Sequence, residues 1–523
     1  MKKYCTLSSL LLLALLNTGL GAEHQASTSW SEPTLEPHAV GFELIEAHDT
    51  TRPPAGPIGP EGGVSPRGRT IRIYRWYPAQ TSEQKPLKLR DYARMAADDF
   101  RPSGAHAHAG GEHNPTRLPV PLAKGLDHDQ LEILLDRETA AIRDASPLAG
   151  SYSVIVFGQG LYYESPLSHV VLCEHLAAAG YLVATCPLVG TFTRLVNLSV
   201  IDLETQIRDL EFVLASARTH PSADPQRLGL IGYDLGGMAA LTLCMRNPDV
   251  DALLSLDAGI LYGHFSTLPQ SHPHYDESRF VIPWLHMTQA RFVPAAAGAN
   301  NQPSLFDRKH YGDTYLLPIQ TNCHGDFTSY ATFGIKRFVP GYWEAASEDA
   351  ERVHAAISAY ALAFFDAFLK DDENARTRLD MDPARSGLTK VLREARCKSG
   401  RTRPPFQEEL VNQIIERGVA TARPAIEKAR RTYPGATIIR EEVLNWLGYH
   451  FLYWWGREFE AIALFALNVE LHPRSANVHD SLGEAYSVNG LRQAAIQSYR
   501  RSLELDPEND NARQALERLG ASR

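Results

Sequence analysis

The sequence predicts an α/β protein whose mostly parallel sheet is covered by helices on both faces and is followed by an all-helical array. Three observations carry this prediction. Strand-like apolar runs alternate with helix-like segments through the middle of the chain. A glycine-rich turn joins one of these strands to a helix. The C-terminal part repeats with a period of 34 residues, which is typical of stacked helical pairs.

Length and charge limit the architecture and the partners. A chain of 523 residues exceeds what one hydrophobic core usually organises, so two or more domains are expected. The 52 basic and 61 acidic residues give a net charge of -9, which has the wrong sign for a general binder of nucleic acids or anionic membranes. We therefore expect a small-molecule substrate or a protein partner.

Residues 1–22 have the layout of a secretory signal peptide. A basic start precedes an apolar run over residues 10–16, and small residues end the segment at Ala22. An uncleaved anchor is the alternative, but the apolar run is too short to span a bilayer. We predict an exported mature chain, periplasmic or extracellular, that begins near Glu23 and has no membrane span.

The cysteines of the predicted mature chain are scattered, without the paired spacing of zinc or redox sites. We expect small buried residues, with one disulfide permitted by an oxidising compartment and at least one thiol left over. No metal or cofactor is predicted. The cysteines are Cys173, Cys186, Cys244, Cys323 and Cys397.

The first domain is predicted over residues 38–370 and begins with two strands, at residues 40–47 and 70–77. A polar insertion follows over residues 80–150, and its segment 127–142 is a candidate lid. Three histidines in the insertion could bind metal beside an acidic residue, but a solvated loop is the favoured interpretation because no helix or strand fixes their geometry. These residues are His106, His108, His113 and Glu112.

The alternating region then supplies the rest of the sheet and its covering helices. Predicted strands lie at residues 153–157, 181–185, 228–231, 252–256, 280–286 and 314–321. Predicted helices lie at residues 166–179, 201–217, 235–245 and 348–369, and the last of these would close the domain.

A charged linker is predicted over residues 371–405, followed by a helical domain over residues 406–523. The 34-residue period runs from Pro473 to Pro507. Its matched positions are small or aromatic, as needed where two antiparallel helices touch, and they are Ala461 with Ala495, Phe465 with Tyr499, and, with one extra residue in the inter-helix turn of the first repeat, Leu447-Gly448 with Leu482-Gly483. This tail resembles the tetratricopeptide family, which implies a protein partner for it.

The strongest candidate for chemistry is the turn Gly232-Tyr233-Asp234-Leu235-Gly236-Gly237, between the strand at 228–231 and the next helix. A strand-to-helix elbow needs small residues around a strained nucleophile so that the backbone can turn sharply. Asp234 occupies the position where a serine is usual. The sequence therefore predicts a nucleophile elbow with an aspartate at its centre.

Two further residues follow in the order that such a site requires. Asp257 ends the next strand, and His324 follows the last one. The intervening segment 288–290 offers no carboxylate, so Asp257 is the residue expected to orient the imidazole. The turn at 158–161 follows a strand, and backbone N–H groups of Gly160, Leu161 and Leu235 are predicted to form an oxyanion hole.

With these residues in place, the region from residue 40 to about residue 333 resembles the platelet-activating-factor acetylhydrolase and dienelactone-hydrolase-like branch of the α/β-hydrolases. The residues that carry the resemblance are Val40-Gly41-Phe42, Asp49-Thr50-Thr51-Arg52, Arg69, Trp76-Tyr77-Pro78-Ala79, the 157–161 turn, the elbow, Ser255-Leu256-Asp257-Ala258, His324 and Phe327. The resemblance implies a nucleophile at Asp234, an acid at Asp257 and a base at His324.

Asp234 departs from that branch, whose members cleave esters or lactones through serine or cysteine. Attack by a carboxylate on a saturated carbon would give an ester that water activated by His324 could cleave, as in haloalkane dehalogenases and epoxide hydrolases of the same fold. Tyr162, Tyr163 and Trp284 are candidate leaving-group donors by residue type. The alternative is an inactive hydrolase scaffold that binds partners through its helical tail.

Overall fold

The computed structural model describes most of the chain, which forms two compact units, Met1–Arg401 and Thr402–Arg523. Each unit is described by itself. The described residues are 37–53, 68–99, 127–161, 164–193, 195–261, 265–293, 303–321, 323–333, 350–381, 390–392, 394–401, 405–433 and 437–521. The predicted signal peptide, His106, His108, His113, Glu112, Tyr162 and Tyr163 lie outside them.

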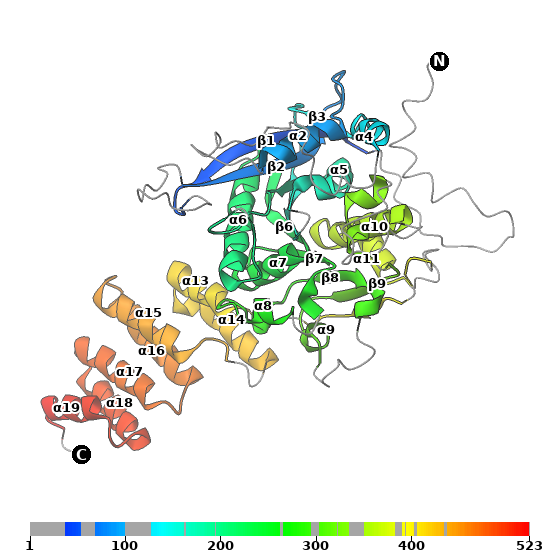
Figure 1. Ribbon diagram of the computed structural model, residues 1–523. Helices are drawn as coiled ribbons and strands as arrows, with labels where there is room; N and C mark the ends of the chain where they lie inside the picture. The colour runs from blue at the N-terminus through cyan, green and yellow to red at the C-terminus, as the bar shows by residue number, and fades with distance from the viewer. Residues whose placement is uncertain are drawn as a thin grey trace. The chain divides into compact units, whose positions relative to one another are not determined.

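A ten-stranded sheet in the order β10-β9-β8-β7-β6-β4-β5-β2-β1-β3 organises the first unit (Figure 1). The six strands from β5 to β9 in this order pair in parallel, whereas β1 and β2 form an antiparallel hairpin at one side. The strands are β1 Ala39–Asp49, β2 Arg69–Ala79, β3 Ala141–Arg143, β4 Tyr152–Gly158, β5 Leu182–Thr185, β6 Ala223–Tyr233, β7 Ala252–Leu256, β8 Trp284–Gln289, β9 Thr314–Ile319 and β10 Arg396–Lys398.

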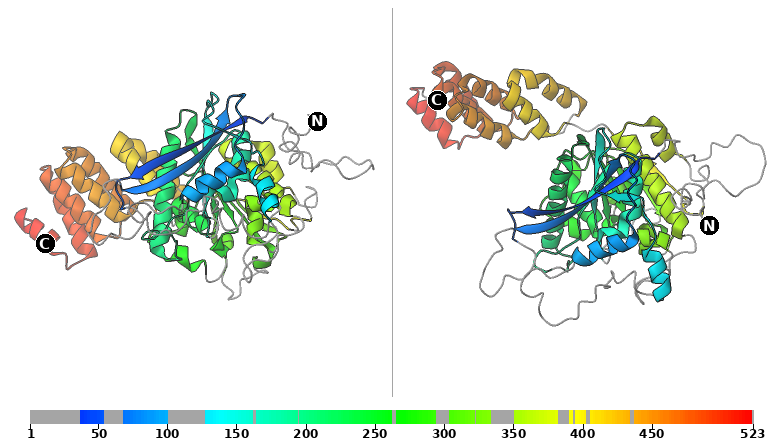
Figure 2. Two further views of the ribbon diagram at one scale, coloured as in Figure 1. Left: turned by 45° about the horizontal axis from the view of Figure 1, so that its top comes forward. Right: turned by 90° about the horizontal axis from the view of Figure 1, so that it is seen from above.

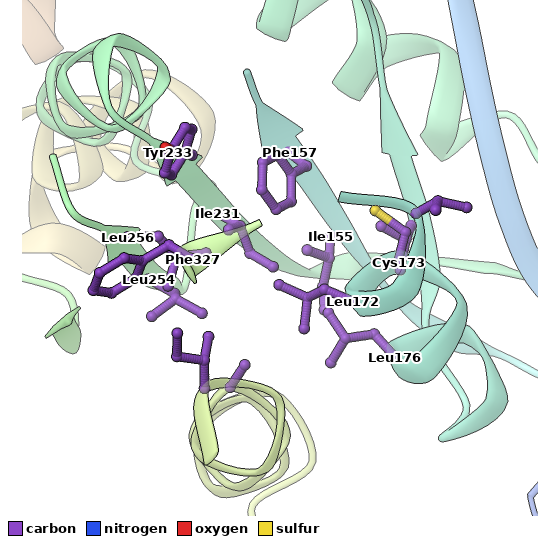
Figure 3. Packing of buried hydrophobic residues seen from close by; sticks show 14 of the residues in the cluster. Ile155, Phe157, Leu172, Cys173, Leu176, Ile231, Tyr233, Leu254, Leu256 and Phe327 are labelled. Carbon is purple, nitrogen blue, oxygen red and sulfur yellow. The ribbon is translucent and has the colours of Figure 1, made fainter. Parts of the chain in front are cut away.

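Helices cover both faces of this sheet, so the central strands are apolar on both sides. Helices α5 (Val170–Ala178) and α10 (Ala350–Leu369) pack on one face, and α6 (Val200–Arg218) and α7 (Leu235–Arg246) pack on the other. Figure 3 shows the first of these layers, where strand residues face α5. The labelled residues are Ile155, Phe157, Leu172, Cys173, Leu176, Ile231, Tyr233, Leu254, Leu256 and Phe327.

Helix α10 is long and apolar enough to cross a membrane by composition, but 78% of its apolar window is buried within the protein. It is the predicted closing helix of the domain, and it packs on the sheet as a core helix. The cysteines of the described residues are all free thiols: four are buried, and Cys397 is exposed.

The polar insertion differs from its prediction because part of it belongs to the sheet and the core. Helix α2 (Leu89–Asp99) lies beside the β1–β2 hairpin, drawn in blue in Figure 2. The indole N–H of Trp76 donates to the Tyr92 hydroxyl (2.8 Å), which donates to Glu174 (2.8 Å). Helix α4 (His128–Leu135) buries two leucines, and β3 pairs with β1. Within the predicted lid, 127–142, α4 therefore packs on the core through Leu134 and Leu135, and residues 141–142 pair with β1 at the edge of the sheet.

The predicted linker also needs correction. Helix α11 (Glu373–Leu379) packs on α10, and β10 pairs with β9. Val391 and Leu392 are fully buried in the first unit. These two apolar residues anchor a charged segment whose composition alone indicated a linker, so the first unit extends to Arg401. Strand β8 also begins later than predicted, at Trp284, directly after Pro283, which has no backbone N–H to donate to a strand ladder.

The second unit is an all-helical array. Its described helices are α13 Gln407–Arg417, α14 Val419–Thr432, α15 Glu441–Tyr453, α16 Glu458–Leu471, α17 Ala476–Val488, α18 Arg492–Leu505 and α19 Asp510–Arg518. The matched glycines of the repeat meet aromatic rings: a Cβ added at Gly448 would lie 2.6 Å from Phe465, and one at Gly483 would lie 2.9 Å from Tyr499. The parallel sheet covered by helices, followed by this array, confirms the predicted fold class.

Candidate active site

The elbow lies between β6 and α7, with Asp234 at its apex. Asp234 has φ 49° and ψ -117°. Residues other than glycine rarely adopt this backbone conformation, and it persists only where the surrounding structure enforces it. The flanking glycines permit the turn. A Cβ at Gly232 would lie 2.4 Å from the carbonyl oxygen of Gly236, and a Cβ at Gly236 would lie 2.2 Å from that of Gly158.

The carboxylate of Asp234 is held by backbone N–H groups. The N–H of Leu161 donates to Oδ2 at 2.9 Å, and the backbone N–H of Leu235 also favours the ionised form of the carboxylate. Burial raises the pKa of Asp234, and this effect is opposed by the charge of His324 and by the two N–H groups. Of the three predicted oxyanion-hole donors, Leu161 therefore bonds to the side chain of Asp234 itself, and Leu235 contributes to its pKa.

Gly160, the third predicted donor, matters at this turn because it has no side chain. A Cβ at this position would lie 2.6 Å from Cδ1 of Tyr233 and 2.7 Å from Cβ of Asp234. Only glycine lets the 158–161 turn approach the elbow this closely. Gln159 fixes the turn through both ends of its side-chain amide. The amide N–H donates to the Thr185 hydroxyl (2.9 Å), and the amide oxygen lies 2.9 Å from Nδ1 of the buried His169.

Asp257 follows β7 and is surrounded by donors. Its carboxylate accepts bonds from the hydroxyl of Thr288 (2.9 Å), the backbone N–H of Gln289 (3.1 Å) and the side-chain amide of Gln289 (2.5 Å). Nδ1 of His324 lies 2.6 Å from Oδ2. Burial opposes ionisation, but His324 and the Gln289 donors lower the pKa of Asp257 to about 2.

His324 begins a 3-10 helix, His324–Phe327, after β9. Burial favours its neutral form, but the hydrogen bond to Asp257 and the charges of Asp257 and Asp234 raise the pKa of the imidazole. Its ring stacks on Tyr233 with centroids 4.4 Å apart and an interplanar angle of 20°, and the Tyr233 hydroxyl donates to the His324 carbonyl oxygen (3.1 Å). A proton on Nδ1, facing Asp257, would leave Nε2 as the basic atom of the neutral ring.

The structure thus brings Asp234, Asp257 and His324 together, with Leu161 and Leu235 beside the first. The sequence analysis looked for a carboxylate in the segment 288–290 and so missed Thr288 and Gln289 as hydrogen-bond donors to Asp257. It also missed the stacking of the Tyr233 ring on His324. The motif contained Tyr233, but no sequence signal indicated its stacking partner. The prediction of Trp284 as a leaving-group donor was wrong. Its side chain is fully buried and its indole donates to Ser255 (2.9 Å), so it is a core residue.

No protein-family model and no curated protein matches this chain. Among solved structures, the chain is similar to a ferulic acid esterase from Streptomyces cinnamoneus, with a TM-score of 0.48 and 19% identity. The alignment covers 71% of this chain and 100% of the esterase. Likeness at this level does not carry the activity of the esterase to this chain.

Proposed function

We propose that the protein is a hydrolase that uses Asp234 as a covalent nucleophile on a small organic substrate with an ester-like, epoxide or halogenated carbon. His324 would act as the base and Asp257 as the acid that orients it. The observation that carries the proposal is the carboxylate of Asp234, which accepts a bond from the Leu161 N–H at a strained elbow beside the His324–Asp257 pair.

In the first step, a carboxylate oxygen of Asp234 attacks the substrate carbon, and the bond to the leaving group breaks with its electron pair. The product is an ester between Asp234 and the substrate carbon. The N–H groups of Leu161 and Leu235 orient the carboxylate for this attack, and the same donors remain beside the carbonyl oxygen of the ester.

In the second step, His324 takes a proton from water as the water oxygen attacks the ester carbonyl carbon. The charge of Asp234 contributes to the raised pKa of His324 in the free protein. Ester formation removes that charge, so the imidazole loses one cause of protonation at the point where a base is needed. Asp257 stabilises the imidazolium. Collapse of the tetrahedral intermediate releases the alcohol and restores the Asp234 carboxylate.

The same contacts disfavour ordinary ester cleavage through an acyl intermediate. An acyl carbonyl oxygen would need the N–H groups that Asp234 already occupies, and it would approach a negatively charged carboxylate. Attack of Asp234 on the acyl carbon would also leave a reactive mixed anhydride. A saturated carbon with a leaving group avoids both difficulties, because the developing negative charge leaves with that group.

The second candidate is a scaffold without hydrolase activity that binds a protein partner through its helical tail. The exposed aromatic side chains of the second unit favour it, including Trp446 at 58% exposure and Trp454 at 69%. We also propose that the tail belongs to the tetratricopeptide family and the first unit to the platelet-activating-factor acetylhydrolase and dienelactone-hydrolase-like branch of the α/β-hydrolases. We further propose that the mature chain is exported.

A covalent adduct separates the two candidates. His324→Gln should allow the first step and stall the second, so intact-mass measurement should find a substrate fragment on Asp234 after incubation with an aryl ester, an aryl epoxide or a bromoalkane. Asp234→Asn should abolish both the adduct and turnover. Three results together would favour the scaffold function: the wild type turns over none of the three substrate classes, His324→Gln forms no adduct, and Asp234→Ser gains ester hydrolysis.

A further inference from the structure

The second unit exposes an aromatic face on α15. Trp446 is 58% exposed and Tyr453 is 50% exposed, and both project from one side of the helix because residues seven apart are separated by about two helical turns. The Tyr449 ring lies between them in sequence and is parallel to Tyr453, with centroids 6.2 Å apart. A shallow hollow adjoins Trp446 and is lined by Arg440, Glu442, Val443 and Trp446. Exposed apolar surface of this kind marks interaction sites.

Two carboxylates of α17 lie beside this aromatic face. Glu484 accepts bonds from the hydroxyls of Tyr453 (2.6 Å) and Tyr449 (3.0 Å), which fix its position. Asp480 precedes Glu484 by one helical turn, and its Oδ1 is buried without a hydrogen-bond partner. Burial and the charge of Glu484 raise the pKa of Asp480 to about 6. Asp480 is therefore mostly ionised at neutral pH, although the like charge of Glu484 one turn away repels it.

The cations of this unit do not neutralise the pair. Among the described residues 405–433 and 437–521, no lysine or arginine forms an ion pair with Asp480 or Glu484. The arginines that form ion pairs here use other acids: Arg423 with Glu427 and Glu470, Arg457 with Glu460, Arg501 with Glu504, and Arg513 with Asp510. The pair thus presents uncompensated negative charge next to exposed aromatic rings.

We propose that this aromatic–acidic face, formed by Trp446, Tyr449, Tyr453, Asp480 and Glu484, binds a segment of a partner protein that carries a lysine or arginine flanked by apolar side chains. The cation would lie between the carboxylates and against the aromatic rings, and both features favour positive charge. The flanking apolar groups would cover Trp446. An anionic lipid surface fits less well because the two carboxylates would repel it. The inference is independent of the proposed hydrolysis.

The test uses the full mature chain and a synthetic library of short acetylated and amidated peptides. Each peptide has lysine, arginine, glutamine or glutamate at its centre and leucine, phenylalanine or serine at the flanking positions. Binding is followed by tryptophan fluorescence and calorimetry. Peptides centred on lysine or arginine with apolar flanks should bind best, and added salt should weaken them because screening reduces charge attraction.

Substitutions then locate the site. Glu484→Gln keeps an oxygen acceptor for the tyrosines but removes the charge, and it should weaken binding about tenfold, as should Trp446→Ala. Asp480→Asn should weaken binding less, and it should remove a loss of affinity that the wild type shows as the pH falls through about 6. Matched controls are Glu517→Gln on α19 and Phe459→Ala on α16, whose ring is 80% exposed and is not among the five residues of this face; both should bind as the wild type does.

Four outcomes would overturn the proposal. Equal binding of lysine-centred and glutamine-centred peptides would remove the role of the cation, as would unchanged affinity in Glu484→Gln. Sedimentation showing a dimer that Trp446→Ala dissociates would assign the face to a second copy of the chain. Binding of phosphatidylglycerol vesicles that requires Trp446 would assign it to lipid. Circular dichroism of each variant confirms that loss of binding does not reflect unfolding.

Discussion

The ends of β6 and β7 carry aspartates with similar backbones and opposite electrostatics. Asp234 and Asp257 each follow a parallel strand, have positive φ values of 49° and 42°, and lie beside His324. The pKa of Asp234 is raised by burial, whereas that of Asp257 is lowered to about 2. The difference comes from the hydrogen-bond donors. Thr288, Gln289 and His324 surround the carboxylate of Asp257, whereas that of Asp234 faces backbone N–H groups. Environment, and not residue type, divides the roles of nucleophile and orienting acid.

After loss of the nucleophile itself, removing the charge of Asp257 should have the largest effect. Asp257→Asn should lower turnover about 10³–10⁴-fold, because an amide cannot hold the imidazole in the required tautomer or stabilise imidazolium. Adduct formation on Asp234 should be much less affected, since His324 acts after it, so the adduct should accumulate in intact-mass spectra. Equal slowing of both steps would contradict the division of roles between the two aspartates.

The raised pKa of Asp234 predicts an acid limit for the first step. In His324→Gln, the rate of adduct formation should be level at high pH and fall tenfold per pH unit below the pKa of Asp234, because only the carboxylate attacks. The midpoint should lie above the ordinary value of 3.8, and loss of the imidazolium charge should raise it further. A midpoint at or below 3.8 would place Asp234 in an environment like that of Asp257.

Asp257 should also contribute to stability in a defined pH range. Its pKa of about 2 in the folded chain, against 3.8 ordinarily, contributes about 2 kcal/mol above pH 4 that is lost as the pH falls from about 4 to about 2. Thermal melts of the wild type should show this decline. The decline should be shallower in Asp257→Asn, and identical slopes would contradict the assigned pKa.

The smallest effect concerns the contact that links the elbow to His324. Tyr233→Phe removes the hydroxyl that donates to the His324 carbonyl and should cost about 1 kcal/mol in stability. Tyr233→Leu also removes the stacked ring, so the pKa of His324 measured by NMR should fall in Tyr233→Leu and stay near the wild-type value in Tyr233→Phe. Equal pKa values in both variants would assign Tyr233 a purely structural role.

The core of the fold was predictable because its signals are local. The apolar strands and amphipathic helices of residues 150–320 follow from period and composition, and β7 begins and ends as predicted. Strands β3 and β10 were missed because three residues carry no measurable period, and their pairing depends on distant partners. Helix α2 was missed because its apolar face lies within a mostly polar segment.

The order of Asp234, Asp257 and His324 along the chain indicated a site, whereas its contacts could not be read from the chain. Thr288 and Gln289 reach Asp257 only because β7 and β8 are adjacent and in register, with Leu256 beside Met287. Tyr233 reaches His324 across 91 residues of sequence. Both contacts depend on how separate elements pack.

The sequence by itself determined where the elbow lies, because glycine spacing and strand-to-helix sterics act within a few residues. It also determined the fold class and the helical repeat, which arise from short periodic patterns. Only the tertiary structure decided how the two aspartates differ, since a pKa depends on donors and charges brought from distant strands. The tertiary structure likewise set Asp480 and Glu484 beside the tyrosines of α15, because residues 31 and 35 positions apart in sequence meet only after their helices pack.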